Sequence, residues 1–223
     1  MKEKYVKNLK DILKCFDIKV PWTEIHDSSD FEEYVVNPFR EKYHKFPYSW
    51  DSGASKGVIA FPTLGFVIKM PLHIIDEDSY YIDDYEEDDN YTDYCALEAD
   101  FYGQAKRLGI EEVFAQTEYV TTLEEEYPIY IQEYIEQREL DEENHIHSDD
   151  DEKTVSSLNE EQYCDEDADI EWEAELLAQK GLDFYNKFKK FIINNNINDL
   201  RWYDNIGYKN GCPICFDYSG FHD

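Results

Sequence analysis

Residues 57–70 read GVIAFPTLGFVIKM, and this stretch decides the fold. It holds two runs of β-branched and aromatic residues, 57–61 and 65–70, separated by a turn that contains a proline and a glycine. Such runs, bounded by turn residues, are typical of short β-strands. Pro71 follows the second run and is expected to end it. The stretch therefore predicts two neighbouring strands of a small antiparallel sheet.

The segments on either side extend this pattern. A helix is expected at 93–108, where apolar residues recur at helical spacing and Gly109 supplies a stop. Residues 17–47 are expected to be rich in turns. The remaining expected elements are a helix at 4–16, a strand at 48–50, strands at 115–121 and 127–134, a helix at 170–193 with Leu177, Phe184, Phe188 and Phe191 facing inward, and a hairpin at 206–218. This order predicts an α+β fold, with a sheet first and a mostly helical part second.

The charge of the chain limits its partners. Its 223 residues include 52 Asp and Glu against 21 Lys and Arg, which gives a formal net charge of −31, and 42% of the residues are hydrophobic. The apolar content allows a real core, so the chain as a whole is not a disordered tail. The negative charge excludes unaided binding to nucleic acid or to anionic membranes, which requires a basic surface. A basic protein partner, a cation, or solubility alone remain open.

Much of this charge lies in two segments. Residues 76–100 hold twelve acidic residues and no Lys or Arg, and residues 136–175 hold eighteen against Arg138 and Lys153. Charges of one sign at this density resist packing, so we expect solvent-exposed insertions at 76–93 and 141–169. The expected organisation is an N-terminal helical extension at 1–45, a sheet-and-helix part at 46–135 and a reduced second part at 136–223.

Neither targeting signals nor cysteines indicate a specialised role. The sequence has no apolar segment long enough for a signal peptide or a membrane span, so we expect a cytoplasmic protein. The five cysteines fit reduced thiols. Cys212 and Cys215 have the spacing of a metal or redox pair, but no second pair completes a zinc site, and two small residues on a buried strand are the preferred interpretation. His145 and His147 lie in an acidic segment and are not expected to hold a metal.

Four groups of residues could carry chemistry. Ser52 to Gly57 form a small-residue turn that lets backbone N–H groups approach a phosphate, or simply a hairpin turn. Lys69 ends an apolar strand and needs an anion, and Glu98 in the next helix offers a carboxylate, so we expect the two to pair. Acidic residues at 199, 204 and 217 bracket the C-terminal hairpin, as a base and a magnesium ligand would.

Together these groups resemble the protein-kinase-like superfamily, and in particular small, C-terminally truncated kinase-like proteins of bacteriophages. The resemblance implies a small N-terminal lobe with an antiparallel sheet and one helix, and a reduced helical C-terminal lobe that ends in a hairpin. It implies ATP and Mg²⁺ as ligands. The matching residues would be Gly53, Ser55 and Lys56 in the glycine-rich loop, Lys69 and its helix partner Glu98 at the phosphates, Glu133 and Ile135 in the segment that meets the adenine, Asp199 as the catalytic base and Asp217 as a metal ligand.

The chain also departs from the kinase pattern. The histidine that usually precedes the catalytic aspartate is absent, and Asp204 stands where the metal-binding asparagine is expected, with Asn205 one residue later. Either of the two could hold a second metal ion. Six residues follow Asp217, so the sequence given includes no activation segment. Purely structural roles also remain open, with Lys69 and Glu98 as an ion pair that joins sheet to helix, and Asp199 and Asp217 as turn residues.

Two functions follow from the sequence. The first is a phage-type kinase-like protein that binds ATP and Mg²⁺ and transfers phosphate to a host target. The alternative is a catalytically inactive, acidic interaction protein that occupies the basic surface of a nucleic-acid-binding host or defence protein and so mimics nucleic acid.

Overall fold

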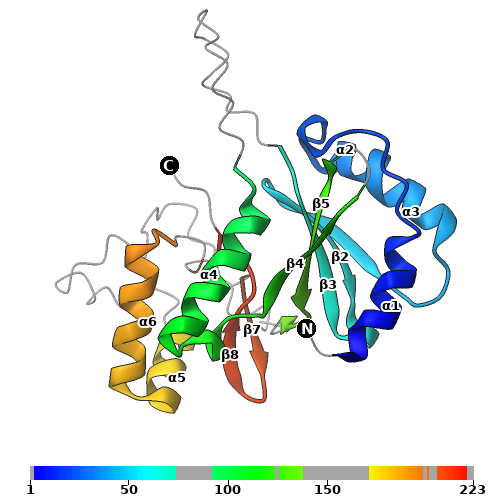
Figure 1. Cartoon of the computed structure of the whole chain (residues 1–223). Helices are drawn as coiled ribbons and strands as arrows, with labels where there is room; N and C mark the ends of the chain where they lie inside the picture. The colour runs from blue at the N-terminus through cyan, green and yellow to red at the C-terminus, as the bar shows by residue number, and fades with distance from the viewer. Residues whose placement is uncertain are drawn as a thin grey trace, which may run out of the picture. The chain divides into compact units, whose positions relative to one another are not determined.

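The structure of the chain is a computed structural model that describes residues 3–73, 92–123, 126–137, 171–197, 200 and 205–219 (Figure 1). It confirms the α+β class, with a five-stranded sheet, a three-stranded sheet and several helices. The chain divides into two compact units, Met1–Ala99 with Thr117–Tyr134, and Asp100–Gln116 with Ile135–Asp223. The insertions expected at 76–93 and 141–169 lie outside the described residues, apart from positions 92 and 93.

The first unit is built on an antiparallel five-stranded sheet with the strand order β1-β2-β3-β5-β4. The stretch quoted at the outset forms its centre, where Ile59 of β2 pairs with Ile68 of β3. All five strands were expected from the sequence, within a few residues at each end. Their bounds are Ser49–Ser52 for β1, Lys56–Phe61 for β2, Phe66–Pro71 for β3, Thr117–Thr122 for β4 and Pro128–Glu133 for β5.

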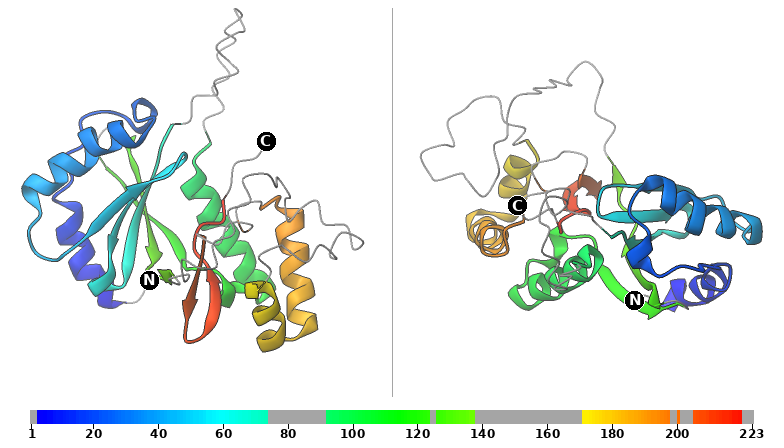
Figure 2. Two further views of the ribbon diagram at one scale, coloured as in Figure 1. Left: turned by 180° about the vertical axis from the view of Figure 1, so that it is seen from behind. Right: turned by 90° about the horizontal axis from the view of Figure 1, so that it is seen from above.

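One face of this sheet is covered by the N-terminal helices (Figures 1 and 2). Helix α1 spans Glu3–Leu13, as expected. The turn-rich structure expected for residues 17–47 is wrong in part, because α2 (Ser28–Phe31), a π-helical turn (Glu32–Val36) and α3 (Asn37–Lys42) follow one another there. The Asp27 carboxylate starts this helical segment by accepting hydrogen bonds from the N–H groups of Ser29 at 2.7 Å and Asp30 at 2.9 Å.

Burial explains why this helical segment forms. It contributes four fully buried apolar side chains to a core shared with the sheet and with Leu9 and Ile12 of α1, and these four are Phe31, Val35, Val36 and Phe39. Phe39 stacks on Phe16 with ring centroids 4.7 Å apart. Each such side chain removed from water contributes about 1.5–3 kcal/mol. Residues 1–45, expected as an extension, therefore supply half of the core of the first unit.

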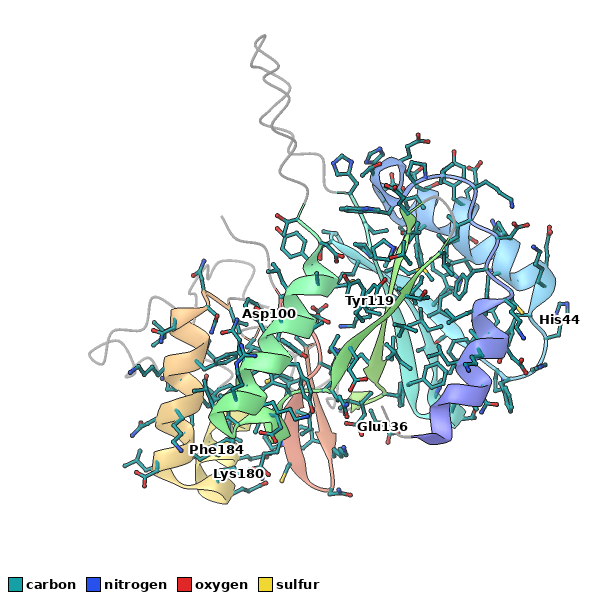
Figure 3. The ribbon with its side chains drawn as sticks, viewed as in Figure 1. His44, Asp100, Tyr119, Glu136, Lys180 and Phe184 are labelled. Carbon is teal, nitrogen blue, oxygen red and sulfur yellow. The ribbon has the colours of Figure 1, made fainter. Side chains whose placement is uncertain are left out.

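Helix α4 spans Tyr94–Leu108, and its residues from Asp100 onward belong to the second unit. The second unit also contains α5 (Glu171–Lys180) and α6 (Leu182–Asn194). The single helix expected at 170–193 is wrong, because Gly181 adopts φ 81° and breaks it into two. The break changes the buried stripe, so that Leu177 is 37% exposed while Phe188 and Phe191 are buried as expected. Phe184 is half-buried, with the Lys180 ammonium 6.0 Å from its ring centroid (Figure 3).

A C-terminal hairpin completes the second unit, as expected. Strands β7 (Ile206–Lys209) and β8 (Cys212–Cys215) are joined by Asn210 and Gly211, both with positive φ, and the short strand β6 (Glu136–Gln137) pairs with β7. Two positive φ values in succession suit the tight turn of a twisted hairpin. Cys212 is half-buried and its thiol donates to the side-chain oxygen of Gln179 at 2.7 Å, while Cys215 is buried and its pKa is well above the ordinary value because of that burial. Both thiols are free.

In the part of the chain that the structure describes, the helices are too short or too polar to cross a membrane.

The close approach of β2 to the N-terminal helices gives a test of this packing. A Cβ atom added at Gly57 would lie 2.3 Å from Cε2 of the buried Phe31 ring. We expect Gly57→Ala to lower the free energy of unfolding by about 1–3 kcal/mol, because the ring and strand must move apart. Urea denaturation monitored by circular dichroism measures this change.

Gly53→Ala is the matched control, since a Cβ atom there meets nothing within 4 Å. We expect it to change the stability by less than about 0.5 kcal/mol. Equal stability of the two variants would contradict the packing of Phe31 against β2.

Candidate functional site

The second face of the five-stranded sheet carries buried polar side chains of the first unit. The strand register places Lys56 and Val58 of β2, Val67 and Lys69 of β3, and Gln132 of β5 on this face. The alternate residues, such as Ile59, Ile68 and Ile131, point to the opposite face and into the core described above. The polar face therefore results from simple alternation along strands whose other face must be apolar.

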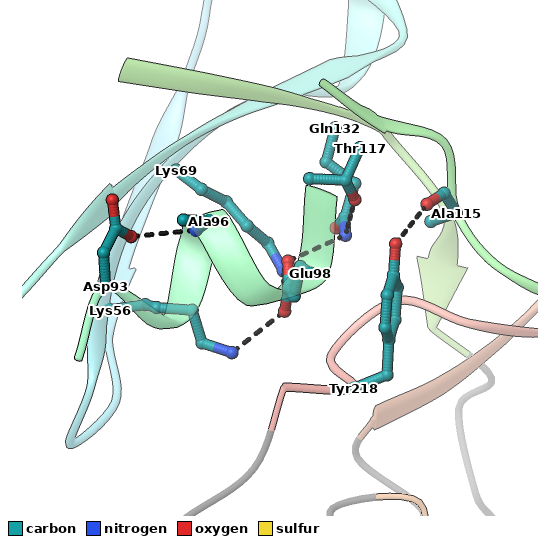
Figure 4. A network of polar contacts seen from close by, with 9 residues as sticks. All are labelled: Lys56, Lys69, Asp93, Ala96, Glu98, Ala115, Thr117, Gln132 and Tyr218. Atoms are coloured by element: carbon teal, nitrogen blue, oxygen red, sulfur yellow. Dashed lines mark hydrogen bonds and ion pairs between the residues drawn. The ribbon is translucent and has the colours of Figure 1, made fainter. Parts of the chain in front are cut away.

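Glu98 of α4 lies against this polar face and binds two lysines (Figure 4). The Lys69 ammonium lies 3.0 Å from Oε1 and 2.8 Å from Oε2 of the Glu98 carboxylate, and the Lys56 ammonium lies 2.9 Å from Oε1. All three residues are buried, with relative exposures of 5% for Lys56, 3% for Lys69 and 0% for Glu98. The ion pair expected between Lys69 and Glu98 is present, and Lys56 joins it.

An amide extends the Glu98 cluster into the sheet. The Gln132 side-chain N–H group donates to Oε2 of Glu98 at 3.3 Å and to Oγ1 of Thr117 at 2.8 Å, and both residues are buried. These hydrogen bonds matter because buried charges are tolerated only where their hydrogen-bonding capacity is used. Lys56, Lys69, Glu98, Gln132 and Thr117 are called the Glu98 cluster below.

The start of α4 fixes the position of Glu98. Oδ1 of Asp93 accepts a hydrogen bond from the N–H group of Ala96 at 2.9 Å and caps the helix. Its Oδ2 accepts a second hydrogen bond from the Tyr130 hydroxyl at 2.6 Å, which ties the cap to β5. Burial, together with this hydrogen bond, raises the pKa of Tyr130 above its ordinary value, so the phenol stays protonated and donates.

Cys95, two residues after the Asp93 cap, contributes a buried thiol to α4. The thiol is fully buried, and burial is the main reason why its pKa is well above the ordinary value; the charges of Asp93 and Glu98 act in the same direction. A thiol held in its protonated form reacts poorly, because the thiolate is the reactive species.

The turn expected at residues 52–57 connects β1 to β2. The Gly53 N–H group donates to the Lys56 carbonyl at 3.0 Å, and the Ser55 carbonyl accepts from the Leu72 N–H group at 2.9 Å. Gly53 is exposed, whereas Ser55 is buried. The Lys56 side chain, at the end of this turn, reaches the Glu98 carboxylate. The turn and the cluster are therefore directly connected through Lys56.

The segment expected to meet an adenine lies where the chain leaves the first unit. Glu133 ends β5 opposite Phe66, and the Tyr134 N–H group donates to the Gly65 carbonyl at 3.1 Å. The first unit ends at Tyr134, and the next residue, Ile135, is buried in the second unit with Ala115 and Ile214. Glu133 and Ile135 therefore stand on either side of the connection between the units.

The C-terminal hairpin places two of the expected metal ligands at one end. Asn205 precedes β7 and Asp217 follows β8, and the Asn205 carbonyl accepts a hydrogen bond from the Phe216 N–H group at 2.9 Å. Next to Asp217, the buried Tyr218 donates from its hydroxyl to the Ala115 carbonyl at 2.9 Å. Asp217 itself is half-buried, and the hydrogen bond of its neighbour Tyr218 fixes this end of the hairpin.

Two expected residues, Asp199 and Asp204, lie outside the described residues, as do His145 and His147. Among the residues that are described, no three or more His, Cys, Asp or Glu side chains gather in a way that could hold a metal ion. The contacts of Gln132 and Thr117 in the Glu98 cluster were not expected from the sequence. The available signal for Gln132 was a polar residue inside the otherwise apolar strand PIYIQE.

The strength of the Glu98 cluster can be measured by removing its single negative charge. Glu98→Gln leaves two buried ammonium groups without the carboxylate that both contact, so we expect the free energy of unfolding to fall by about 3–5 kcal/mol. Chemical denaturation at neutral pH provides the measurement.

Glu112→Gln is the matched control, because Glu112 forms an ion pair with Lys180 at 2.9 Å but is mostly exposed. We expect that variant to lose no more than about 1 kcal/mol. If Glu98→Gln cost no more than the control, the cluster would not be the anchor between α4 and the sheet.

Comparisons of the chain with protein-family models, curated proteins and solved structures found no match. A function for the chain therefore has to be inferred from its residues and their contacts.

Proposed function

We propose that the chain is a kinase-like protein that binds ATP together with Mg²⁺ and transfers phosphate to an acceptor. The observation that carries this proposal is the buried ion pair between Lys69 on β3 and Glu98 on α4, at 2.8 Å. In protein kinases, a lysine on the third strand pairs with a glutamate of the following helix, and this pair positions the lysine for the nucleotide phosphates. The chain has the same residue types on the same kinds of element.

The surroundings of Lys69 support a nucleotide as the ligand. Val58, Ala60 and Val67 lie on the same face of the sheet as Lys69 and are half-buried. An apolar strand surface beside an ammonium group suits a molecule with a flat, apolar ring system and a negatively charged tail. The small-residue turn that ends at Lys56 begins β2 on this face.

The resemblance assigns the remaining roles. Lys69 would contact the α- and β-phosphates, Asp199 would accept the proton of the acceptor hydroxyl, and Asp217 would bind Mg²⁺, with Asn205 or Asp204 as a second ligand. The carboxylate of Asp217 and the amide oxygen of Asn205 are hard oxygen donors of the kind that Mg²⁺ prefers. A bound Mg²⁺ ion would neutralise charge on the phosphate oxygens. Catalysis would then consist of positioning and electrostatic stabilisation by these side chains.

A second candidate function is favoured by the net charge of −31. A chain with this charge could act without catalysis, by binding the basic surface of a host or defence protein that normally binds nucleic acid. Such a protein would not need a live nucleotide site. ATP binding therefore separates the two candidates.

Calorimetric titration of the purified chain with ATP, with Mg²⁺ and then with EDTA, tests the proposed function. We expect ATP to bind more tightly with Mg²⁺ than with EDTA, and Lys69→Met to weaken binding about 10- to 100-fold because a charge-assisted contact to phosphate is lost. Asp217→Asn should remove the difference between Mg²⁺ and EDTA. Asp183→Asn, on the exposed start of α6, should behave like the wild type.

If the wild-type chain did not bind ATP in either condition, the kinase-like function would be excluded and the acidic interaction protein favoured. If Asp217→Asn kept the full magnesium dependence, Asp217 would be an ordinary residue at the end of the hairpin.

A further inference from the structure

We propose that Lys56 is a second phosphate-binding lysine, so that Lys56 and Lys69 together form a two-ammonium site for a polyphosphate group. This inference rests on the proposed function and adds a specificity to it. Kinase-like catalysis requires one lysine on the third strand. Here a second lysine from the neighbouring strand reaches the same carboxylate oxygen.

The geometry brings the two ammonium groups together. Both lie within 3.0 Å of Oε1 of Glu98, so they are neighbours around one oxygen atom. They reach it from adjacent antiparallel strands, with Lys56 paired to Pro71 and Lys69 paired to Val58, which places both side chains on the same face of the sheet. Linked phosphates carry several charged oxygens, and one polyphosphate chain can therefore contact both groups.

The energetics of the Glu98 cluster favour a role beyond anchoring. Two ammonium groups held side by side in a buried site repel each other, and burial itself penalises each charge. Fixing α4 to the sheet requires one lysine, and Lys69 already contacts both oxygens of Glu98. Groups that break the rules of stability without a structural need are typical of functional sites. A polyanionic ligand would relieve the repulsion between the two lysines.

The connection to the turn indicates which part of a ligand Lys56 contacts. Lys56 is the first residue of β2, and its carbonyl accepts the Gly53 N–H group that closes the turn. A phosphate close to Lys56 would therefore also be close to the turn. Lys69 lies farther from the turn, because it stands on β3 two residues before Pro71, the partner of Lys56. The two lysines are thus offset along the strands, which suits successive phosphates of one chain better than a single phosphate.

This assignment predicts which ligands depend on Lys56. ATP and inorganic tripolyphosphate should depend on both lysines, whereas adenosine, which has no phosphate, should depend on neither. A merely structural role of Lys56 would instead alter the binding of all three ligands in parallel, or only the stability of the fold. The ratio of ATP affinity to adenosine affinity therefore distinguishes the two roles.

The test is calorimetric titration of the wild type, Lys56→Gln, Lys56→Met and Lys69→Met with ATP, tripolyphosphate and adenosine. We expect each substitution to weaken the binding of ATP and tripolyphosphate about 10- to 100-fold, and to leave the affinity for adenosine within about twofold of the wild-type value. Lys106→Met, at an exposed position of α4, is the control and should bind all three ligands like the wild type. Circular dichroism verifies the fold of each variant, and Lys56→Gln retains an N–H donor toward Glu98 if Lys56→Met does not fold.

If Lys69→Met lost affinity for ATP while Lys56→Gln did not, the two-lysine site would be overturned and the proposed function would stand. If the wild type bound neither ATP nor tripolyphosphate, both would fall.

Discussion

The carboxylate of Glu98 is the constraint on which the first unit depends. It is fully buried, and it can be so only because two ammonium groups and the Gln132 amide surround it. Those partners come from three strands, β2, β3 and β5, none of which is next to Glu98 in sequence. Burial of the Glu98 carboxylate therefore requires the sheet order that makes these strands neighbours. It also requires the Asp93 cap that fixes the start of α4.

The two faces of the five-stranded sheet bury different kinds of side chain. One face packs against α1, α2 and α3 through aromatic and aliphatic side chains, such as Phe31 and Phe39, and supplies most of the apolar burial. The other face can then carry buried lysines, because the apolar core offsets the free-energy cost of burying their charges. This division explains why an acidic chain keeps two of its 21 basic residues buried beside each other.

Much of the fold could be predicted from the sequence, because the strands of the first unit alternate strongly and the C-terminal hairpin has a clear turn. The ion pair of Lys69 with Glu98 could be predicted because a lysine on an apolar strand needs an anion. The contact of Lys56 with Glu98 could not, since it depends on the register between β2 and β3. The helices at 28–42 were not placed individually because each is shorter than two turns and a π-helical turn lies between them. The break at Gly181 was missed because a glycine inside a helical pattern is often tolerated.

The central claim is that the ammonium groups of Lys56 and Lys69 share Glu98 and bind phosphate. The most direct test is nitrogen-15 NMR of the lysine side chains, with the two signals assigned by Lys56→Arg and Lys69→Arg. We expect two ammonium signals that exchange slowly with water in the free protein, because both groups are buried and hydrogen-bonded. Both signals should move when ATP and Mg²⁺ are added. Fast exchange of either group in the free protein, or signals that stay in place at saturating ATP, would contradict this claim.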